Sequence, residues 1–181
     1  MCISSSFLSL LSSGQPGGQN SISCTSAIPV RCLQPAASIE ILVLMSNQII
    51  ELANRFYSDV INKGDLVAMN DTVSEDFTDH FAPPNSKPGL DGFKDFLGMV
   101  SAAFPDIRIT VEDLIVGNNK VVARLTIEGT HTGNLMGNIP PTHKHATWTG
   151  IDILQITNGK ITDRWSQRDL LSLIKQLGVI Q

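Results

Sequence analysis

The hydrophobic period of this sequence changes once, from helical to alternating, near residue 105. Before it, apolar residues recur at helical spacing, as in Ile49, Leu52, Phe56 and Val60. After it, apolar and polar residues alternate, as expected for half-buried strands. Helices followed by consecutive strands predict an α+β fold. The absence of alternating strands and helices excludes a Rossmann-type parallel sheet, and no GxGxxG or GxxxxGK[ST] motif is present.

The turn and cap residues divide this pattern into elements. Ser46 is expected to cap a first helix that ends at Gly64, and Asp65 a short second one. A third helix is expected from Leu90 to Phe104, because Pro105 stops it. The expected strands are 107–116, 121–128, 146–157 and 160–166, and the closing helix begins near residue 170. Asn158-Gly159 predicts a hairpin between the last two strands.

Charged residues are almost confined to the part of the chain after residue 45. Residues 1–45 contain only Arg31 and Glu40, whereas all three cysteines lie there. We therefore divide the chain into a tail, 1–45, and one domain, 46–181. The domain carries the net charge of −4, so we expect no nucleic-acid partner, which would require a basic excess. No apolar run reaches the ~18 residues of a membrane span, so we expect no membrane insertion.

The tail has two interpretations. Residues 1–38 are rich in Ser, Gly and Pro, a composition typical of disorder. A Ser-rich, acid-poor start is also typical of an organelle transit peptide, and Val30-Arg31-Cys32 is similar to a plastid processing site. This interpretation predicts a plastid protein. The alternative is that Met45 is the true start and the protein is cytoplasmic.

An ordered set of short motifs resembles one family. The motifs are Phe104-Pro105-Asp106, Val111-Glu112-Asp113, Gly129-Thr130-His131-Thr132-Gly133, Ile139-Pro140-Pro141-Thr142, Thr149-Gly150-Ile151, Gly159-Lys160-Ile161 with Trp165 and Asp169, and Gln176-Leu177-Gly178. In this order they resemble the SnoaL-like polyketide cyclases, whose α+β cone is related to nuclear transport factor 2. The resemblance covers about residues 47–180. His143 stands where the family's loop usually has glycine.

The resemblance implies a cone-shaped, curved, mostly antiparallel sheet that encloses an apolar pocket with the N-terminal helices. It also implies a cofactor-free ester cyclase that closes a ring by aldol condensation, with a carboxylate as general acid and base. The ligand would be a small hydrophobic, enolisable carbonyl compound, for cyclisation or isomerisation. The alternatives are a non-catalytic module that binds such a ligand and a dimeric assembly domain of the same fold.

The family match places the acid/base at Asp169. Ile161, Asp163, Trp165, Gln167 and Asp169 share one parity of an extended strand, and Ile161 and Trp165 indicate that this face points inward. An inward carboxylate is desolvated, which raises its pKa and makes it a usable base. Asp163 is the competing carboxylate, but it is expected near the outer end of the strand, close to Arg164 or solvent. A cap of the closing helix is the alternative role for Asp169.

Two histidines complete the predicted catalytic set. His131 lies on the same strand parity as the apolar residues Val121, Ala123, Leu125 and Ile127, so it is expected to face the pocket. There it could donate a hydrogen bond to an enolate oxygen. His80 matches the family's Asp-His pair near the cavity. A structural role in the core or at its rim is the alternative for both. Without an HExxH helix or a Cys/His framework, we expect no metal site.

The remaining predictions concern apolar surfaces. Trp148, Trp165 and Phe81 are expected to form the wall of the pocket that binds the substrate. The strands carry apolar residues on both parities, with Val122 beside Val121, and Ile151 and Ile153 beside Leu154 and Ile156. A sheet with one wet face should alternate more cleanly, so this pattern predicts a homodimer through the outer sheet face.

Overall fold

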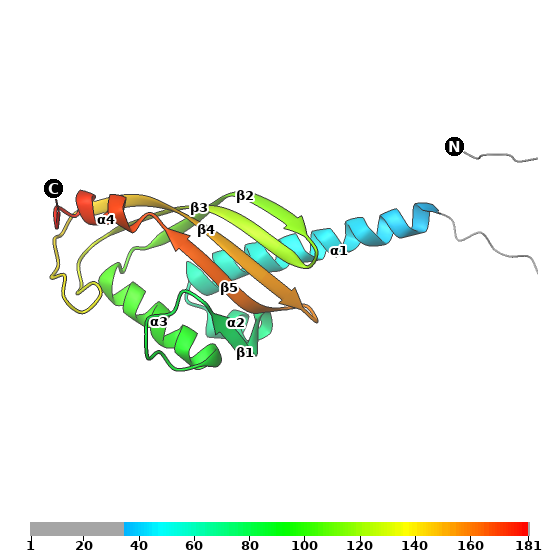
Figure 1. Ribbon diagram of the computed structural model, residues 1–181, viewed down its shortest axis with the longest axis horizontal. Helices are drawn as coiled ribbons and strands as arrows, with labels where there is room; N and C mark the ends of the chain where they lie inside the picture. Colours follow the sequence, from blue (N-terminus) through cyan, green and yellow to red (C-terminus); the bar gives the residue numbers. More distant parts are fainter. Residues whose placement is uncertain (1–34, 181) are drawn as a thin grey trace, which may run out of the picture. The chain divides into compact units, whose positions relative to one another are not determined.

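The computed structural model describes residues 35–180 (Figure 1). Its elements follow in the order α1 (Pro35–Arg55), a π-helical turn η1 (Phe56–Ile61), α2 (Leu66–Thr72), β1 (Val73–Asp79), α3 (Gly89–Ala103), β2 (Arg108–Gly117), β3 (Lys120–Thr130), β4 (His145–Thr157), β5 (Lys160–Arg168) and α4 (Leu170–Gln176). The predicted α+β class is confirmed. The interpretations of the tail up to residue 34 lie outside the described residues.

The five strands form one sheet in the order β1-β5-β4-β3-β2. β2 to β5 form an antiparallel meander, and β1 pairs with β5 in parallel. One face, called the inner face here, buries Val121, Ala123 and Leu125 of β3 in the same hydrophobic core as Ala53 of α1 and Phe93 of α3. The opposite side is called the outer face. Figure 1 shows α2 and α3 together on one side of the sheet.

The helices follow their predicted caps in part. Asp65 caps α2, because its carboxylate accepts hydrogen bonds from the backbone N–H groups of Val67 and Ala68 at 2.8 and 3.1 Å. The expected start of the first helix at Ser46 is wrong. α1 already begins at Pro35, and the Ser46 hydroxyl donates to the Leu42 carbonyl within it. The helix then widens into η1, which buries Phe56, Tyr57 and Val60 together.

The first strand of the sheet was missing from the prediction. β1 has the sequence VSEDFTD and buries only Val73 and Phe77, so it shows no sustained alternation. The β4–β5 hairpin is confirmed: Asn158 and Gly159 have φ values of 51° and 75°, as a type I′ turn requires. Among residues 35–180, no helix has both the length and the hydropathy needed to cross a membrane.

A β-bulge in β5 overturns the parity prediction. Gln155 pairs with Asp163, but its neighbour Ile156 pairs with Ile161, so Thr162 has no partner of its own. Beyond Thr162 the side chains exchange faces. Ile161, Arg164 and Ser166 are buried on the inner face, whereas Trp165, Gln167 and Asp169 are exposed. The expectation that Trp165 and Asp169 face inward is therefore wrong, whereas Asp163 is partly exposed, as expected.

Candidate functional site

Two of the predicted site residues meet at the edge of the sheet. The rings of His80, just after β1, and Trp165 on β5 are stacked, with centroids 4.4 Å apart. The Nε2 atom of His80 lies 3.1 Å from Oδ1 of Asp163, the competing carboxylate. The Asp163 and His80 side chains are 31% and 37% exposed, so solvent reaches this acid–base pair. Trp165 is 36% exposed on the outer face and is not part of an inner pocket wall.

Phe81 follows His80 but contacts a different element. Its ring meets Phe96 of α3 edge-on, with centroids 6.3 Å apart. Its backbone N–H is held by the carboxylate of Asp79 at 3.1 Å. The structure therefore separates Phe81 from the His80–Trp165 pair, although the two residues are adjacent in sequence.

A second group of predicted residues surrounds Phe104, the residue after α3. The Phe104 ring lies 5.2 Å from that of His131 and 5.3 Å from that of Trp148 on β4. Trp148 is 7% exposed and His131 is fully buried. The predicted inward orientation of both residues agrees with this burial. They form an aromatic cluster at the end of the sheet that contacts α4.

The hydrogen bonds of His131 define its protonation. The backbone N–H of Thr142 donates to Nδ1 at 3.3 Å, so Nδ1 is the unprotonated nitrogen. Burial lowers the pKa of His131 below 6.5, against the opposing effect of the Gly133 carbonyl, and the ring is neutral at pH 7. Nε2 therefore carries the proton. It is enclosed and has no hydrogen-bond partner among the described residues.

Asp169 lies between β5 and α4. Its backbone N–H donates to Thr149, next to Trp148, and its carboxylate accepts the backbone N–H of Ser172 at 2.9 Å. It is thus the N-cap of α4, as the alternative interpretation had it. The residue is exposed, and this cap is the one hydrogen bond its carboxylate makes among the described residues. The cap leaves Asp169 accessible to a ligand.

The inner face carries a polar network that the sequence prediction missed. Asp152 of β4 is fully buried and accepts hydrogen bonds from the hydroxyls of Tyr57 and Ser166, at 3.1 and 2.6 Å. Arg168 of β5 binds both of its carboxylate oxygens, at 2.6 and 3.1 Å. Burial alone would raise the pKa of Asp152, but Arg168, Arg164 and Ser166 together outweigh it, and the pKa lies below its ordinary value. Asp152 is therefore ionised and is a poor base.

A second ion pair lies beside this network. Arg164 donates to Asp79 at 2.8 Å, and their side chains are only 4% and 5% exposed. The guanidinium also lies over the rings of Phe93 and Phe96, at 4.9 and 5.4 Å from their centroids. Both charges are thus fully engaged, so this pair stabilises the fold and is unsuited to proton transfer.

One signal could have revealed the network. Asp152 shares the parity of Leu154 and Ile156 in an apolar strand, so a buried acid was already visible there. Its partners Ser166 and Arg168 were hidden by the bulge, which changes their face. Among the described residues, no group of three or more His, Cys, Asp or Glu residues could hold a metal ion.

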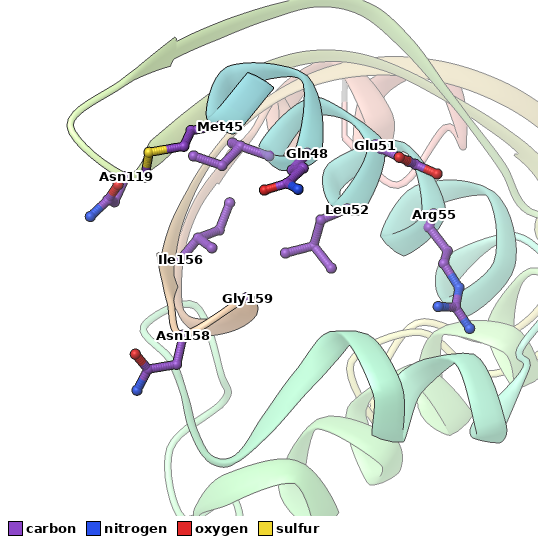
Figure 2. A pocket seen from close by; sticks show the side chains of 10 residues that line it. Met45, Gln48, Glu51, Leu52, Arg55, Asn119, Ile156, Asn158 and Gly159 are labelled. Carbon is purple, nitrogen blue, oxygen red and sulfur yellow. The ribbon is translucent and has the colours of Figure 1, made fainter. Parts of the chain in front are cut away.

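Two open hollows lie beside α1. The first, of about 570 Å³, is shown in Figure 2, where α1 side chains face the turns at Asn119 and Asn158. The second, of about 480 Å³, lies between η1 and β2. None of the predicted site residues lines either hollow. Arg55, which borders both, is held by Asp71 at 2.9 Å, so we do not place the proton-transfer chemistry there.

Comparisons with known proteins agree with this fold. The family model for the SnoaL-like polyketide cyclases matches residues 51–177. TsrD from Streptomyces laurentii is 27% identical with a TM-score of 0.68, covering 74% of this chain and 97% of TsrD. A candidate polyketide cyclase from Bacillus cereus is 34% identical with a TM-score of 0.63, and the match covers 74% of this chain and 83% of that protein. A SnoaL-like polyketide cyclase from Agrobacterium tumefaciens is 25% identical with a TM-score of 0.59, and the match covers 70% of this chain and 98% of that protein. A search of curated proteins found no match.

Proposed function

The chain belongs to the SnoaL-like polyketide cyclase family, and we propose that it is an acid/base catalyst that acts on a small, hydrophobic, enolisable carbonyl compound. Asp169 removes the proton from the carbon next to the carbonyl. The Nε2–H of His131 donates a hydrogen bond to the carbonyl oxygen and stabilises the enolate. The same carboxyl group returns its proton to the alkoxide that forms when the ring closes.

The unpartnered Nε2–H of His131 is the observation that carries this proposal. A buried donor without a partner costs about 1–3 kcal/mol. An unpaired buried donor in a native protein is expected to have a functional reason, and a ligand oxygen that accepts the Nε2–H hydrogen bond would remove this energetic cost. A neutral imidazole donor suits an enolate oxygen, because its hydrogen bond strengthens as negative charge develops. The neighbouring rings of Phe104 and Trp148 supply an apolar surface for the ligand. Since Nε2 is enclosed, the ligand must open the packing around it.

Asp169 is the carboxylate best suited to the proton transfer. Asp152 and Asp79 are held by arginines, whereas Asp169 is exposed and bonded to a single backbone N–H. Its backbone N–H is bonded to Thr149, the neighbour of Trp148 on β4. The pair His80–Asp163 is the competing proton-transfer group, because it is accessible and hydrogen-bonded.

The test follows deuterium uptake at the carbon next to the carbonyl, by NMR in D₂O, with a panel of aryl ketones and ketoesters. Asp169→Asn keeps the cap, since Asn caps as well as Asp, and should slow exchange ~10²–10⁴-fold. Asp163→Asn is the matched control and should leave the rate within a few-fold. The reverse result would assign the chemistry to His80–Asp163. Binding without any enzyme-dependent exchange would instead favour a non-catalytic binding module.

The role of His131 is tested by two substitutions whose amide side chains differ in length. His131→Asn can still accept the Thr142 N–H but places no donor at the Nε2 position, so exchange should fall ~10²–10³-fold. His131→Gln can restore a donor there and should recover part of the rate. Equal rates for both variants and the wild type would contradict the role given to His131. Mass spectrometry of a ligand that co-purifies with the protein would identify the substrate class directly.

A further inference from the structure

Five consecutive apolar residues are exposed near the start of α1. The side chains from Ile41 to Met45 are 48–63% exposed. Since 3.6 residues make one turn of an α-helix, five of them cover its whole circumference. Figure 1 shows this part of α1 extending beyond the ends of the β2–β3 and β4–β5 hairpins. We call residues 40–45 the overhang, in which Glu40 is the one charged residue.

The first hollow begins where the overhang ends. One of its walls is a single face of α1, whose members recur with the period of a helix: Met45, Gln48, Ile49, Leu52 and Arg55. The opposite wall is formed by Ile156 and by the turns at Asn119 and Asn158, as Figure 2 shows. With a volume of about 570 Å³ and apolar side chains on both walls, the hollow can accept apolar side chains from another segment.

The overhang and the hollow cannot meet within one molecule. Both belong to the same continuous helix, Pro35–Arg55, so the overhang points away from the wall that follows it. Ile41 lies one turn before Met45 and continues the face that lines the hollow. Two copies of α1 that lie antiparallel bring these surfaces together twice, because each overhang then covers the other copy's hollow. A contact that repeats in this way is isologous.

The two surfaces agree in length. At a rise of about 1.5 Å per residue, the overhang extends ~9 Å, and the wall from Gln48 to Arg55 extends ~12 Å. When Glu40 lies beside Arg55 of the second copy, Ile41 lies near its Leu52. The two-fold axis then passes between positions 47 and 48, so the two Gln48 side chains meet there. An apolar helix segment seated in a groove is a common mode of recognition.

The same register brings opposite charges together. Glu40 meets Arg55, the cation that lines the hollow. Arg55 donates one hydrogen bond to Asp71 at 2.9 Å and retains further N–H groups for a second carboxylate. Glu51, the acid that lines the hollow, lies one turn before Arg55, so Glu40 stands nearer to the cation than to the acid.

We propose that α1 is a self-association helix, whose overhang binds in the first hollow of a second copy with the two helices antiparallel. The hollow lies beside the turn that opens β3 at Lys120, whereas His131 follows the other end of that strand. The inference is therefore independent of the proposed catalysis. With two short helix segments per copy, the contact is smaller than the ~800 Å² per partner of a stable interface. Association should therefore be reversible on dilution, and it adds nothing to the stability of a single chain.

The test is the molar mass of the full chain by light scattering over a concentration series, with a reductant because the tail contains three cysteines. The mass of the wild type should double between the lowest and the highest concentration. Ile41→Lys in the overhang and Gln48→Lys in the hollow should each raise the dissociation constant on the order of 100-fold, because each contact would bury two lysines. Both residues are exposed, so the variants should fold. Met99→Lys on α3, 54% exposed in the wild type, is the matched control and should associate as the wild type does.

A cysteine cross-link tests the antiparallel geometry. In a chain whose three tail cysteines are replaced by serine, Gln48→Cys should form disulfide-linked dimers on mild oxidation. The two-fold axis brings the two copies of position 48 within the ~4.4–6.8 Å between Cα atoms that a disulfide spans. Asn54→Cys, exposed on the same helix, is the matched control, because its two copies would lie about 20 Å apart along the helices.

The outcomes separate this contact from other associations. An association through the outer sheet face would raise the masses of the wild type and of all variants equally, and would leave their difference intact. Equal masses for the wild type and both lysine variants at every concentration would overturn the proposal. A loss caused by only one of the two variants would also overturn it, since the overhang and the hollow would then not bind each other. Equal cross-linking at positions 48 and 54 would contradict the antiparallel register.

Discussion

The imidazole of His80 lies parallel to the indole of Trp165, with 4.4 Å between the ring centroids and 5° between the ring planes. The sequence predicted both residues for one pocket inside the domain. They do meet, but on the outer side of the sheet, with Asp163 hydrogen-bonded to the imidazole. The cause is the single unmatched residue Thr162, which turns the following side chains to the opposite face. This edge group therefore belongs to the outer face and is separated from His131 and Trp148.

The part of α1 before Ser46 should contribute little to stability. The side chains from Ile41 to Met45 are 48–63% exposed, so their removal uncovers almost no core. A chain that begins at Met45 should melt within ~2–4 °C of the full chain, the shift that 1 kcal/mol causes in a domain of this size. A chain that begins at Asn54 also loses Ile49, Leu52 and the fully buried Ala53, and it should melt at a much lower temperature. Similar large losses for both chains in a thermal scan would contradict this.

The main architecture was readable from the sequence because its signals are local. The helical spacing of Phe93, Phe96 and Val100 predicted α3, and Pro105 its end. Asn158-Gly159 predicted the last hairpin, because that dipeptide tolerates positive φ. Asp65 as a helix cap depends only on its nearest neighbours. These features need no information from distant parts of the chain.

The candidate site was less predictable because it depends on partners far apart in the sequence. The bulge at Thr162 is a property of the pairing between β4 and β5, and parity counted along β5 alone cannot detect it. β1 was missed for the same reason, since its pairing with β5 and the ion pair of Asp79 with Arg164 stabilise it more than its own pattern does. The inward orientation of His131, by contrast, followed from an uninterrupted alternation in β3.

Replacing His143, which stands where the family's loop usually has glycine, by that residue should stabilise the protein. His143 has a φ of 56°, the left-handed region that costs a residue with a Cβ roughly 1–2 kcal/mol. His143→Gly should remove this strain and, after the greater flexibility of the unfolded chain is subtracted, raise the free energy of unfolding by about 0.5–1 kcal/mol. His143→Ala keeps the Cβ and should give no gain. Urea titrations in which both variants change stability equally would show that backbone strain is not the cause.

The buried pair Asp79–Arg164 should be far more sensitive than a surface pair. Asp79→Ala leaves the Arg164 guanidinium buried without a counter-charge and should lower the free energy of unfolding by ~3–5 kcal/mol. Asp71→Ala is the matched control: its pair with Arg55 is about half exposed, and its loss should cost below ~1 kcal/mol. Urea unfolding of both variants measures the difference. Similar costs would mean that solvent screens the Asp79 pair despite its burial.

Tyr57 offers a direct view of the inner network, because it is the only tyrosine in the chain. Burial, followed by the negative charge of Asp152, raises its pKa well above the ordinary value of 10.0. The folded state therefore favours the neutral phenol. Its contribution to stability is complete below pH ~10 and is lost as the pH rises above that value.

An alkaline titration of the tyrosinate absorbance tests this. In the folded protein the signal should rise only well above pH 10, together with unfolding, whereas the urea-unfolded chain should titrate near 10. Asp152→Asn removes the neighbouring charge and should lower the midpoint, provided that circular dichroism shows the variant to be folded. Tyr57→Phe should show no signal and should lose less stability above pH 10 than the wild type. A folded wild type that titrates near pH 10 would show that Tyr57 reaches solvent and that the hydrogen bond to Asp152 does not hold it in the core.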